Sequence, residues 1–308
     1  MKNSFDICET KGRFAGHETF PLRLLWLKKA YDAVKNGVPS GSFHEPEAIS
    51  RFGVGRNMAV SMRYWALAAR MIAEEGKMLV ETDLGKAVLS EDGWDPFLER
   101  PATLWLVHWN LASDPEFTTT IYFAFNAVAS AEFDAATIVE GLEALVDKKG
   151  WRAATVTLRR DVEVFLRGYI RREDASIEDA AEPLLAELGL VRGIKPGNWY
   201  EFVRGPKPTL PDSVFAYALG MFWERSSNDI ATLSAEQICY APGSPGRVFK
   251  LDEDSVVTRL MRLEALTDGA WLWTDTAGLR QIQRQRNVDL LSILAEAYPK
   301  KLKGECTI

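Results

Sequence analysis

The pair His17 and Glu18 stands in a short polar segment, Gly-His-Glu-Thr, that is flanked by two phenylalanines. An imidazole beside a carboxylate can act in acid–base chemistry or bind a metal ion. The alternative role is structural, because a single histidine in a loop often fixes the chain by hydrogen bonding to the backbone. The sequence leaves both roles open, and these two residues are therefore candidates for catalysis.

A second candidate site is the loop of residues 242–250. Two glycines let the backbone come close to a ligand, a serine offers a hydroxyl, and an arginine and a lysine place two positive charges beside it. This combination suits the phosphate of a phosphodiester. The residues concerned are Gly243, Ser244, Gly246, Arg247 and Lys250. We assign Arg247 as a catalytic candidate, and Ser244 and Lys250 as DNA-binding candidates.

The acidic residues Asp252, Glu253 and Asp254 follow this loop directly. A cluster of carboxylates can hold Mg²⁺. Acidic residues at the start of a helix also cap it and interact favourably with its dipole. In that case the loop is only the lead-in to a helix that begins at Asp252 or Asp254. The sequence leaves these alternatives open, and it names no metal ligands.

Common catalytic signatures are absent from the sequence. It has no Gly-x4-Gly-Lys-Ser/Thr phosphate loop, no Gly-x-Gly-x-x-Gly, no His-Glu-x-x-His and no Gly-x-Ser-x-Gly elbow. The three histidines, His17, His44 and His108, are far apart, which argues against a histidine-rich metal site. The three cysteines show no Cys-x-x-Cys spacing, which fits a reducing cytosol.

Residues 56–70 are predicted to form an amphipathic helix that carries three arginines and no acidic residue. At about 100° per residue, Arg56, Arg63 and Arg70 fall on a face away from the apolar side chains. This pattern is typical of the recognition helix of a DNA-binding domain, although an arginine stripe can also be a solvated face. Arg56, Asn57, Arg63 and Arg70 are therefore DNA-binding candidates.

The surrounding chain predicts a winged-helix domain over residues 1–92. An amphipathic helix over 22–35 comes first, and a short helix over 45–52 with a glycine turn precedes the arginine-rich helix. A hairpin over 72–80 and a helix capped by Thr82 come after it. Helix, turn, helix and hairpin is the order of elements in winged-helix domains.

A helical middle domain is predicted over residues 93–205. The aromatic stretches 101–109 and 121–126 indicate a buried helical layer, which makes His108 a hydrogen-bonded core residue. Two short strands are expected later, at 190–192 and 199–203.

Two further helices of this middle domain fit a second helix-turn-helix. The first is capped by Asp134, and the second begins near residue 155 and carries Arg159 and Arg160. These arginines are also DNA-binding candidates. The case for phosphate contact is weaker than for the first helix-turn-helix, because Asp161 and Glu163 are mixed with them.

A C-terminal winged-helix-like domain is predicted over residues 206–308, after a proline-rich break. Helices over 212–223 and 252–266, a hairpin about Asp268-Gly269 and a helix start at Thr274-Asp275 repeat the N-terminal order. The predicted fold is mainly α with small β-hairpin wings, in which N- and C-terminal winged-helix (helix-turn-helix) domains surround a helical middle domain.

The composition is that of an ordinary globular protein: 308 residues, 47% hydrophobic and 26% charged, with a formal net charge of -6. A pI near 5.4 argues against non-specific coating of nucleic acid, which needs broad positive charge, so any DNA contact must come from local patches. The sequence shows no leader and no membrane-spanning stretch, and we expect a cytoplasmic protein with no membrane partner.

The chain also resembles the SspB family, long catalogued as a domain of unknown function. The resemblance runs from about residue 14 to 280 and rests on several specific segments. These are Phe-x-Gly-His-Glu-Thr-Phe-Pro-Leu-Arg at 14–23, Gly-Val-Gly-Arg-Asn-Met at 53–58, Arg-Tyr-Trp at 63–65, Pro-Ala-Thr-Leu-Trp-Leu-Val-His-Trp at 101–109, Thr-Leu-x-Arg-Asp-Val at 157–162 and Ser-Pro-Gly-Arg-Val-Phe at 244–249.

SspB proteins belong to bacterial anti-phage systems that replace a non-bridging phosphate oxygen on one DNA strand with sulfur. The resemblance implies a nickase for one strand of double-stranded DNA, which works with a cysteine desulfurase, an ATPase and an ATP-pyrophosphatase-like sulfurtransferase. A divalent cation such as Mg²⁺ would be the usual cofactor for cleavage. The alternative is a non-catalytic DNA-binding adaptor that recruits the sulfur-transfer machinery. Whether the chain forms a homodimer stays open.

Overall fold

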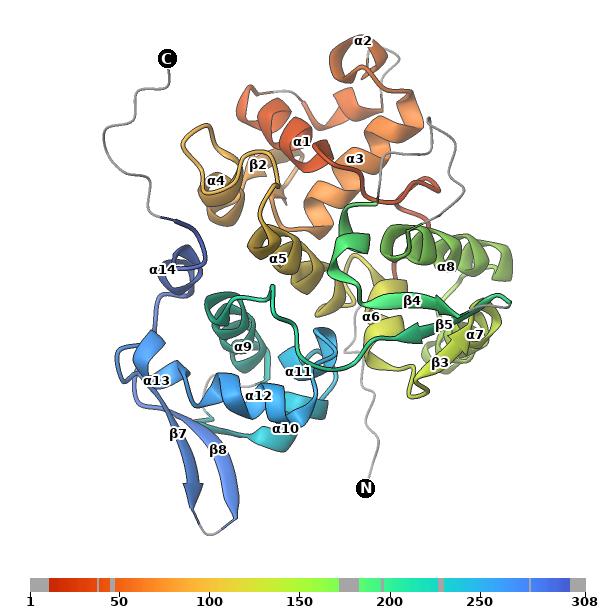
Figure 1. The fold of residues 1–308 in the computed structure, drawn as a ribbon. Helices are drawn as coiled ribbons and strands as arrows, with labels where there is room; N and C mark the ends of the chain where they lie inside the picture. Colours follow the sequence, from red (N-terminus) through yellow and green to blue (C-terminus); the bar gives the residue numbers. More distant parts are fainter. Residues whose placement is uncertain are drawn as a thin grey trace.

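The structure is a computed structural model that describes residues 11–37, 39–44, 48–171, 183–194, 197–226, 230–276 and 278–299. It is mainly α-helical with three small antiparallel sheets, which confirms the predicted class of fold. Figure 1 shows the N-terminal elements at the top, the middle elements at the right and the C-terminal elements below, with helix α5 between them. None of the described helices combines the length and hydropathy needed to cross a membrane.

The N-terminal part consists of helices around one β-hairpin. Its elements are α1 (Trp26–Lys35), η1 (Ser40–Phe43), α2 (Ala48–Phe52), α3 (Arg56–Ala68), β1 (Ile72–Glu75), β2 (Met78–Glu81) and α4 (Asp83–Leu89). The predicted hairpin and the Thr82 cap are confirmed, since the Thr82 side chain accepts a hydrogen bond from the Gly85 amide. Helix α1 begins later than predicted because Leu25 has a left-handed φ of 66°. Residues 45–47 of the predicted short helix lie outside the described residues.

The middle part contains two buried helices and one three-stranded sheet. Its elements are α5 (Pro101–Ala112), α6 (Thr119–Asn126), β3 (Glu132–Asp134), α7 (Ala135–Lys149), α8 (Thr155–Tyr169), η2 (Leu184–Leu188), β4 (Val191–Ile194) and β5 (Trp199–Phe202). Every residue of α6 is buried, as is every residue of α5 after Pro101, so the predicted aromatic layer is confirmed. The Asp134 cap and both predicted strands are confirmed too.

The C-terminal part has the same kind of sheet. Its elements are α9 (Asp212–Ser226), β6 (Thr232–Ser234), α10 (Ala235–Tyr240), α11 (Pro245–Val248), α12 (Glu253–Leu260), α13 (Leu263–Leu266), β7 (Trp271–Thr276), β8 (Leu279–Arg284) and α14 (Leu290–Ala295). The predicted helix start at Thr274-Asp275 is wrong, because both residues lie in β7 and pair with β8. The hairpin therefore turns after Thr276 and not at Asp268-Gly269.

The middle and C-terminal parts share one order of elements, namely a helix, a short strand, further helices and a hairpin. Their sheets also share one strand order, β3-β5-β4 and β6-β8-β7, in which the strand before the helices pairs with the last strand of the hairpin. The N-terminal part has the helices and the hairpin, and its described sheet has two strands. The order that the sequence suggests at both ends of the chain thus occurs in the middle as well.

His108 lies on α5 in the core that all three parts share. Its Nε2 donates to the carbonyl of Val248 at 2.9 Å, and its Nδ1 accepts from the hydroxyl of Tyr169 at 2.7 Å. The predicted role as a hydrogen-bonded core residue is confirmed. Burial lowers the pKa of His108 to about 3, so the neutral ring is the stable form in the folded protein.

His108 should make the protein sensitive to acid. His108 takes up a proton near pH 6.5 in the unfolded chain and only near pH 3 in the folded chain. The free energy of unfolding therefore decreases as the pH is lowered from 6.5 to 3. We expect a loss of about 1.4 kcal/mol per pH unit below 6.5 from this residue. Urea unfolding at several pH values measures the slope, which should shrink in His108→Gln and persist in His44→Gln. An equal slope in the wild type and His108→Gln would contradict this assignment.

Candidate functional site

The first candidate site is the segment of residues 13–20, which lies between α3, α6 and α8. Asp161 on α8 holds it: one carboxylate oxygen accepts from the Ala15 amide at 2.9 Å and contacts Nε2 of His17 at 3.1 Å. The other carboxylate oxygen accepts from the hydroxyl of Thr120, on α6, at 3.2 Å. Three segments far apart in the sequence therefore meet at one buried carboxylate.

His17 is 5% exposed, and both of its ring nitrogens are engaged. Besides the contact with Asp161, Nδ1 accepts from the backbone amide of Thr19 at 3.2 Å, and the ring stacks on Trp65. The loop-fixing hydrogen bond considered from the sequence is thus present. Glu18, in contrast, is exposed. A catalytic role for either residue stays a prediction, and Glu18 is the one that a substrate can reach in this conformation.

The backbone of this segment adopts conformations that non-glycine residues rarely take. Ala15, Glu18 and Thr19 have φ values of 62°, 47° and 68°. Each left-handed residue costs free energy, and such residues are enriched at functional sites. The guanidinium of Arg167, on α8, donates to the carbonyl of Thr19 at 3.2 Å and helps to hold the turn. The surrounding contacts, not local preference, therefore fix the position of Glu18.

Helix α3 presents fewer free arginines than its sequence suggests. Arg56 and Asn57 are exposed at its first turn, and their side chains form no hydrogen bond or ion pair with another described residue. Arg63 pairs with Glu74 of the hairpin. Arg70 lies beyond the end of the helix, has a φ of 60° and pairs with Asp114 at 2.7 Å. The prediction that all three arginines line one helical face is wrong, because the chain turns before Arg70.

Helix α8 separates the charges that its sequence mixes. Arg159 and Arg160 are exposed, whereas Asp161 points into the protein and is 5% exposed. The buried Asp161 therefore does not weaken the case for phosphate contact by the exposed arginines in the way that the sequence suggested. The outer face of α8 carries Arg159 and Arg160, with Glu163 as the exposed acidic residue.

The second candidate site is a group of cations where the middle and C-terminal parts meet, which we call the junction cluster: Arg204, Lys207, Arg247 and Lys250. Lys250 is 4% exposed, donates to the carbonyl of Phe125 at 2.7 Å and lies 4.0 Å from the centroid of the Phe202 ring. Its pKa is well below the usual value because it is buried and because Arg247 and Arg204 are near. Lys250 is therefore a buried lysine with two arginines nearby.

The other members of the junction cluster add positive charge. Burial lowers the pKa of Arg247, and Arg204 lowers it further. Arg247 donates to the carbonyl of Tyr240 at 2.9 Å, while its buried Nε has no partner among the described residues. Burial also lowers the pKa of Lys207, which Asp252 partly offsets. Cations that depress one another's pKa favour the binding of an anion between them, and such groups mark candidate functional sites.

Ser244 and Asp252 are used as helix caps. The Ser244 side chain is 0% exposed and accepts from the Arg247 amide, and Asp252 accepts from the Ser255 amide at 2.7 Å. The predicted helix cap at Asp252 is therefore confirmed, and phosphate contact by the loop stays a prediction. In this conformation Ser244 and Lys250 lie inside the protein, whereas Arg247 is half-buried and Arg204 is exposed.

The two candidate sites lie at opposite ends of α6. Thr120, near its start, contacts Asp161, and Asn126, at its end, accepts from the Gly243 amide at 2.7 Å. Within the described part of the chain, no contact joins His17 or Glu18 with Arg247. Arg204 is a candidate that sequence reasoning missed, because it lies 43 residues before Arg247 and only the fold brings them together.

The described side chains do not form an evident metal site. No three His, Cys, Asp or Glu residues gather among them. The buried or half-buried carboxylates near the candidate sites already have partners: Asp161 binds His17 and Thr120, and Asp252 accepts from the Ser255 amide. The residues present therefore give no ligand set for Mg²⁺, and we assign none.

Comparisons with known proteins bear on the whole chain. A family model described as a protein of unknown function (DUF4007) matches residues 14–298. The fold is similar to a crystal structure of magnesium ion-bound SspB, with a TM-score of 0.84 and 26% sequence identity. The match covers 95% of this chain and 90% of the SspB chain. A second SspB crystal structure has a TM-score of 0.82 at 26% identity, with 93% and 88% covered. No curated protein matches the chain.

Proposed function

We propose that this chain binds duplex DNA and nicks one strand during phosphorothioate modification of the backbone. The chain belongs to the DUF4007 family and shares its fold with SspB. The observation that carries this proposal is the similarity to SspB over 95% of the chain. As partners we propose the cysteine desulfurase, the ATPase and the ATP-pyrophosphatase-like sulfurtransferase of such a system.

DNA binding is supported by the helices that precede the hairpins. We propose that the parts containing α3 and α8 are winged-helix units that contact DNA through these helices, as recognition helices do. Arg56 and Asn57 on α3, and Arg159 and Arg160 on α8, are exposed where such contacts would form. The corresponding helix of the C-terminal part, α12, begins with exposed Glu253 and Asp254, which would repel phosphates.

The junction cluster is the place we propose for the phosphodiester that is cut. Two guanidinium groups, from Arg204 and Arg247, can donate paired hydrogen bonds to phosphate oxygens. Positive charge fixed at this point stabilises the negative charge that builds up on those oxygens as a water oxygen bonds to phosphorus and the bond to the leaving oxygen breaks, with a proton of the water passing to that oxygen. One SspB crystal structure is magnesium ion-bound, and we keep a divalent cation as the proposed cofactor of cleavage without assigning residues of this chain to it.

The adaptor is the second candidate function. Both ring nitrogens of His17 are engaged in this conformation, which favours a chain that binds DNA and leaves cutting to a partner. Both functions require DNA binding through the same arginines. They differ only in whether the chain cuts DNA alone.

DNA binding can be tested at Arg56. We expect Arg56→Ala to weaken affinity for a duplex about 3- to 10-fold, and to make the slope of log K against log salt shallower by about 0.9, because one phosphate contact is lost. Fluorescence anisotropy at several salt concentrations measures both. Arg63→Ala is the matched control on the same helix, and its effect should be smaller because Arg63 pairs with Glu74. If Arg56→Ala binds the duplex with unchanged affinity, α3 is not part of the DNA interface.

A further inference from the structure

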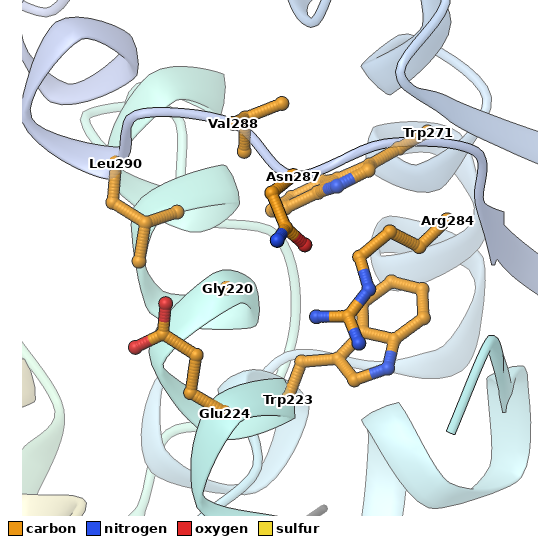
Figure 2. Close-up of a pocket in the computed structure, with 8 residues that line it drawn as sticks. All are labelled: Gly220, Trp223, Glu224, Trp271, Arg284, Asn287, Val288 and Leu290. Carbon is orange, nitrogen blue, oxygen red and sulfur yellow. The ribbon is translucent and has the colours of Figure 1, made fainter. Parts of the chain in front are cut away.

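A cavity of about 290 Å³ lies between α9, the β7–β8 hairpin and the segment that leads into α14 (Figure 2). It is separate from both candidate sites, since it shares no lining residue with the segment 13–20 or the junction cluster. At its edge α9 and α14 pack so tightly that a Cβ on Gly220 would lie 2.2 Å from a methyl carbon of Leu290. The space beside this contact is partly open to solvent, because Glu224 and Asn287 of its lining are exposed.

A buried donor without a partner borders the cavity. Trp271 is 2% exposed, and its Nε1 has no hydrogen-bond partner among the described residues. Buried polar groups are nearly always paired, so an unpaired one needs an explanation. Figure 2 shows the indole nitrogen on the side of the ring that faces Arg284 and Asn287. An acceptor within the cavity would satisfy it.

Two more donors line the same space. The guanidinium of Arg284 lies over the ring of Trp223, 5.1 Å from its centroid, and its Nη2 also donates to the carbonyl of Ile230 at 3.5 Å. Asn287 adds an exposed side-chain amide, and Glu224 supplies a carboxylate on the α9 side (Figure 2). An indole N–H, a guanidinium and an amide together favour a ligand with negatively charged acceptor oxygens.

We propose that this cavity binds a small oxyanion, a carboxylate or a phosphate monoester, through Trp271 and Arg284. A water molecule takes up ~30 Å³ of liquid, so the cavity has room for the oxyanion and an attached group. A hydroxyl or amino group on that attached part can donate to Glu224. Two sources share this chemistry: a free small anion and the terminal phosphate of a DNA strand. The proposal does not depend on nicking by this chain.

The test follows the indole N–H signals of the full-length protein, labelled with ¹⁵N at tryptophan, by NMR. The Trp271 signal is identified by its loss in Trp271→Phe. Inorganic phosphate, acetate, and a short oligonucleotide with or without a 5′-phosphate are then titrated. We expect a saturable shift of the Trp271 signal, with affinity at least ~10-fold weaker in Arg284→Gln, because a charge-assisted hydrogen bond is lost. Arg286→Gln is the matched control, since Arg286 pairs with Asp268 outside the cavity.

The outcomes separate the alternatives. Saturation by phosphate or acetate supports a free small anion, and saturation only by the 5′-phosphorylated oligonucleotide supports a strand end. No saturable shift with any of the four probes overturns the proposal, as does equal affinity in Arg284→Gln and the wild type. If Arg284→Gln does not fold, Asn287→Ala takes its place, because Asn287 is exposed and its loss should still weaken binding.

Discussion

Arg247→Ala is expected to lower the rate of DNA nicking about 100-fold or more. Removing one preorganised donor from the charge that develops in a transition state typically costs ~10²–10³ in rate. Arg247 fits this role because it is half-buried, next to Arg204, and its Nε has no partner among the described residues. The rate is measured as the appearance of open-circular plasmid from supercoiled plasmid.

Two variants make this result specific. Arg286→Ala removes an exposed arginine of the same domain that pairs with Asp268, and it should nick at the wild-type rate. Arg204→Ala removes the neighbour of Arg247 and should also slow nicking. Duplex affinity is also measured for each variant, because weaker DNA binding alone could slow nicking without a catalytic role for the substituted residue. If Arg247→Ala nicks DNA at the wild-type rate, the junction cluster has no catalytic role in nicking.

The second large effect is expected at Asp161. Asp161→Ala removes the acceptor of the Ala15 amide, His17 and Thr120, and leaves the last two donors buried without this partner. Each unmet buried donor costs about 1–3 kcal/mol, so for these two donors the free energy of unfolding should fall by about 2–6 kcal/mol. Urea unfolding followed by circular dichroism measures it.

Glu163→Ala is the matched control for Asp161→Ala, because Glu163 is an exposed acidic residue two positions further along the same helix. Its substitution should change stability by less than about 0.5 kcal/mol. A loss below about 1 kcal/mol in Asp161→Ala would show that the segment 13–20 is held by other contacts. The position of Glu18 would then not depend on this carboxylate.

Helices and caps could be predicted from the sequence because their signals are local. Thr82, Asp134 and Asp252 each accept from an amide two or three residues inside their helix, so a short stretch of chain contains the whole interaction. The same local rule failed at Thr274-Asp275. There the pairing of β7 with β8, which depends on residues further along the chain, decides the structure.

The candidate sites depend on contacts that no spacing reveals. The sequence singles out Arg247 and Lys250 by residue type, but Arg204 joins them only because the chain after β5 is hydrogen-bonded to residues 250 and 251. Asp161 appears in the sequence as one charge among several on α8. Its inward direction follows from contacts with segments 41 and 144 residues away. Burial likewise removes Ser244 from the surface, although its residue type suits a phosphate.

The most direct test of the proposed function uses the purified chain alone. Supercoiled plasmid is incubated with the wild type and with Arg247→Ala, each in Mg²⁺ and in EDTA. The proposed nickase predicts open-circular plasmid with the wild type in Mg²⁺, and little with Arg247→Ala or in EDTA. Plasmid that stays supercoiled under every condition, while the same protein still shifts duplex DNA in a gel, would contradict the nickase and assign the cutting to a partner.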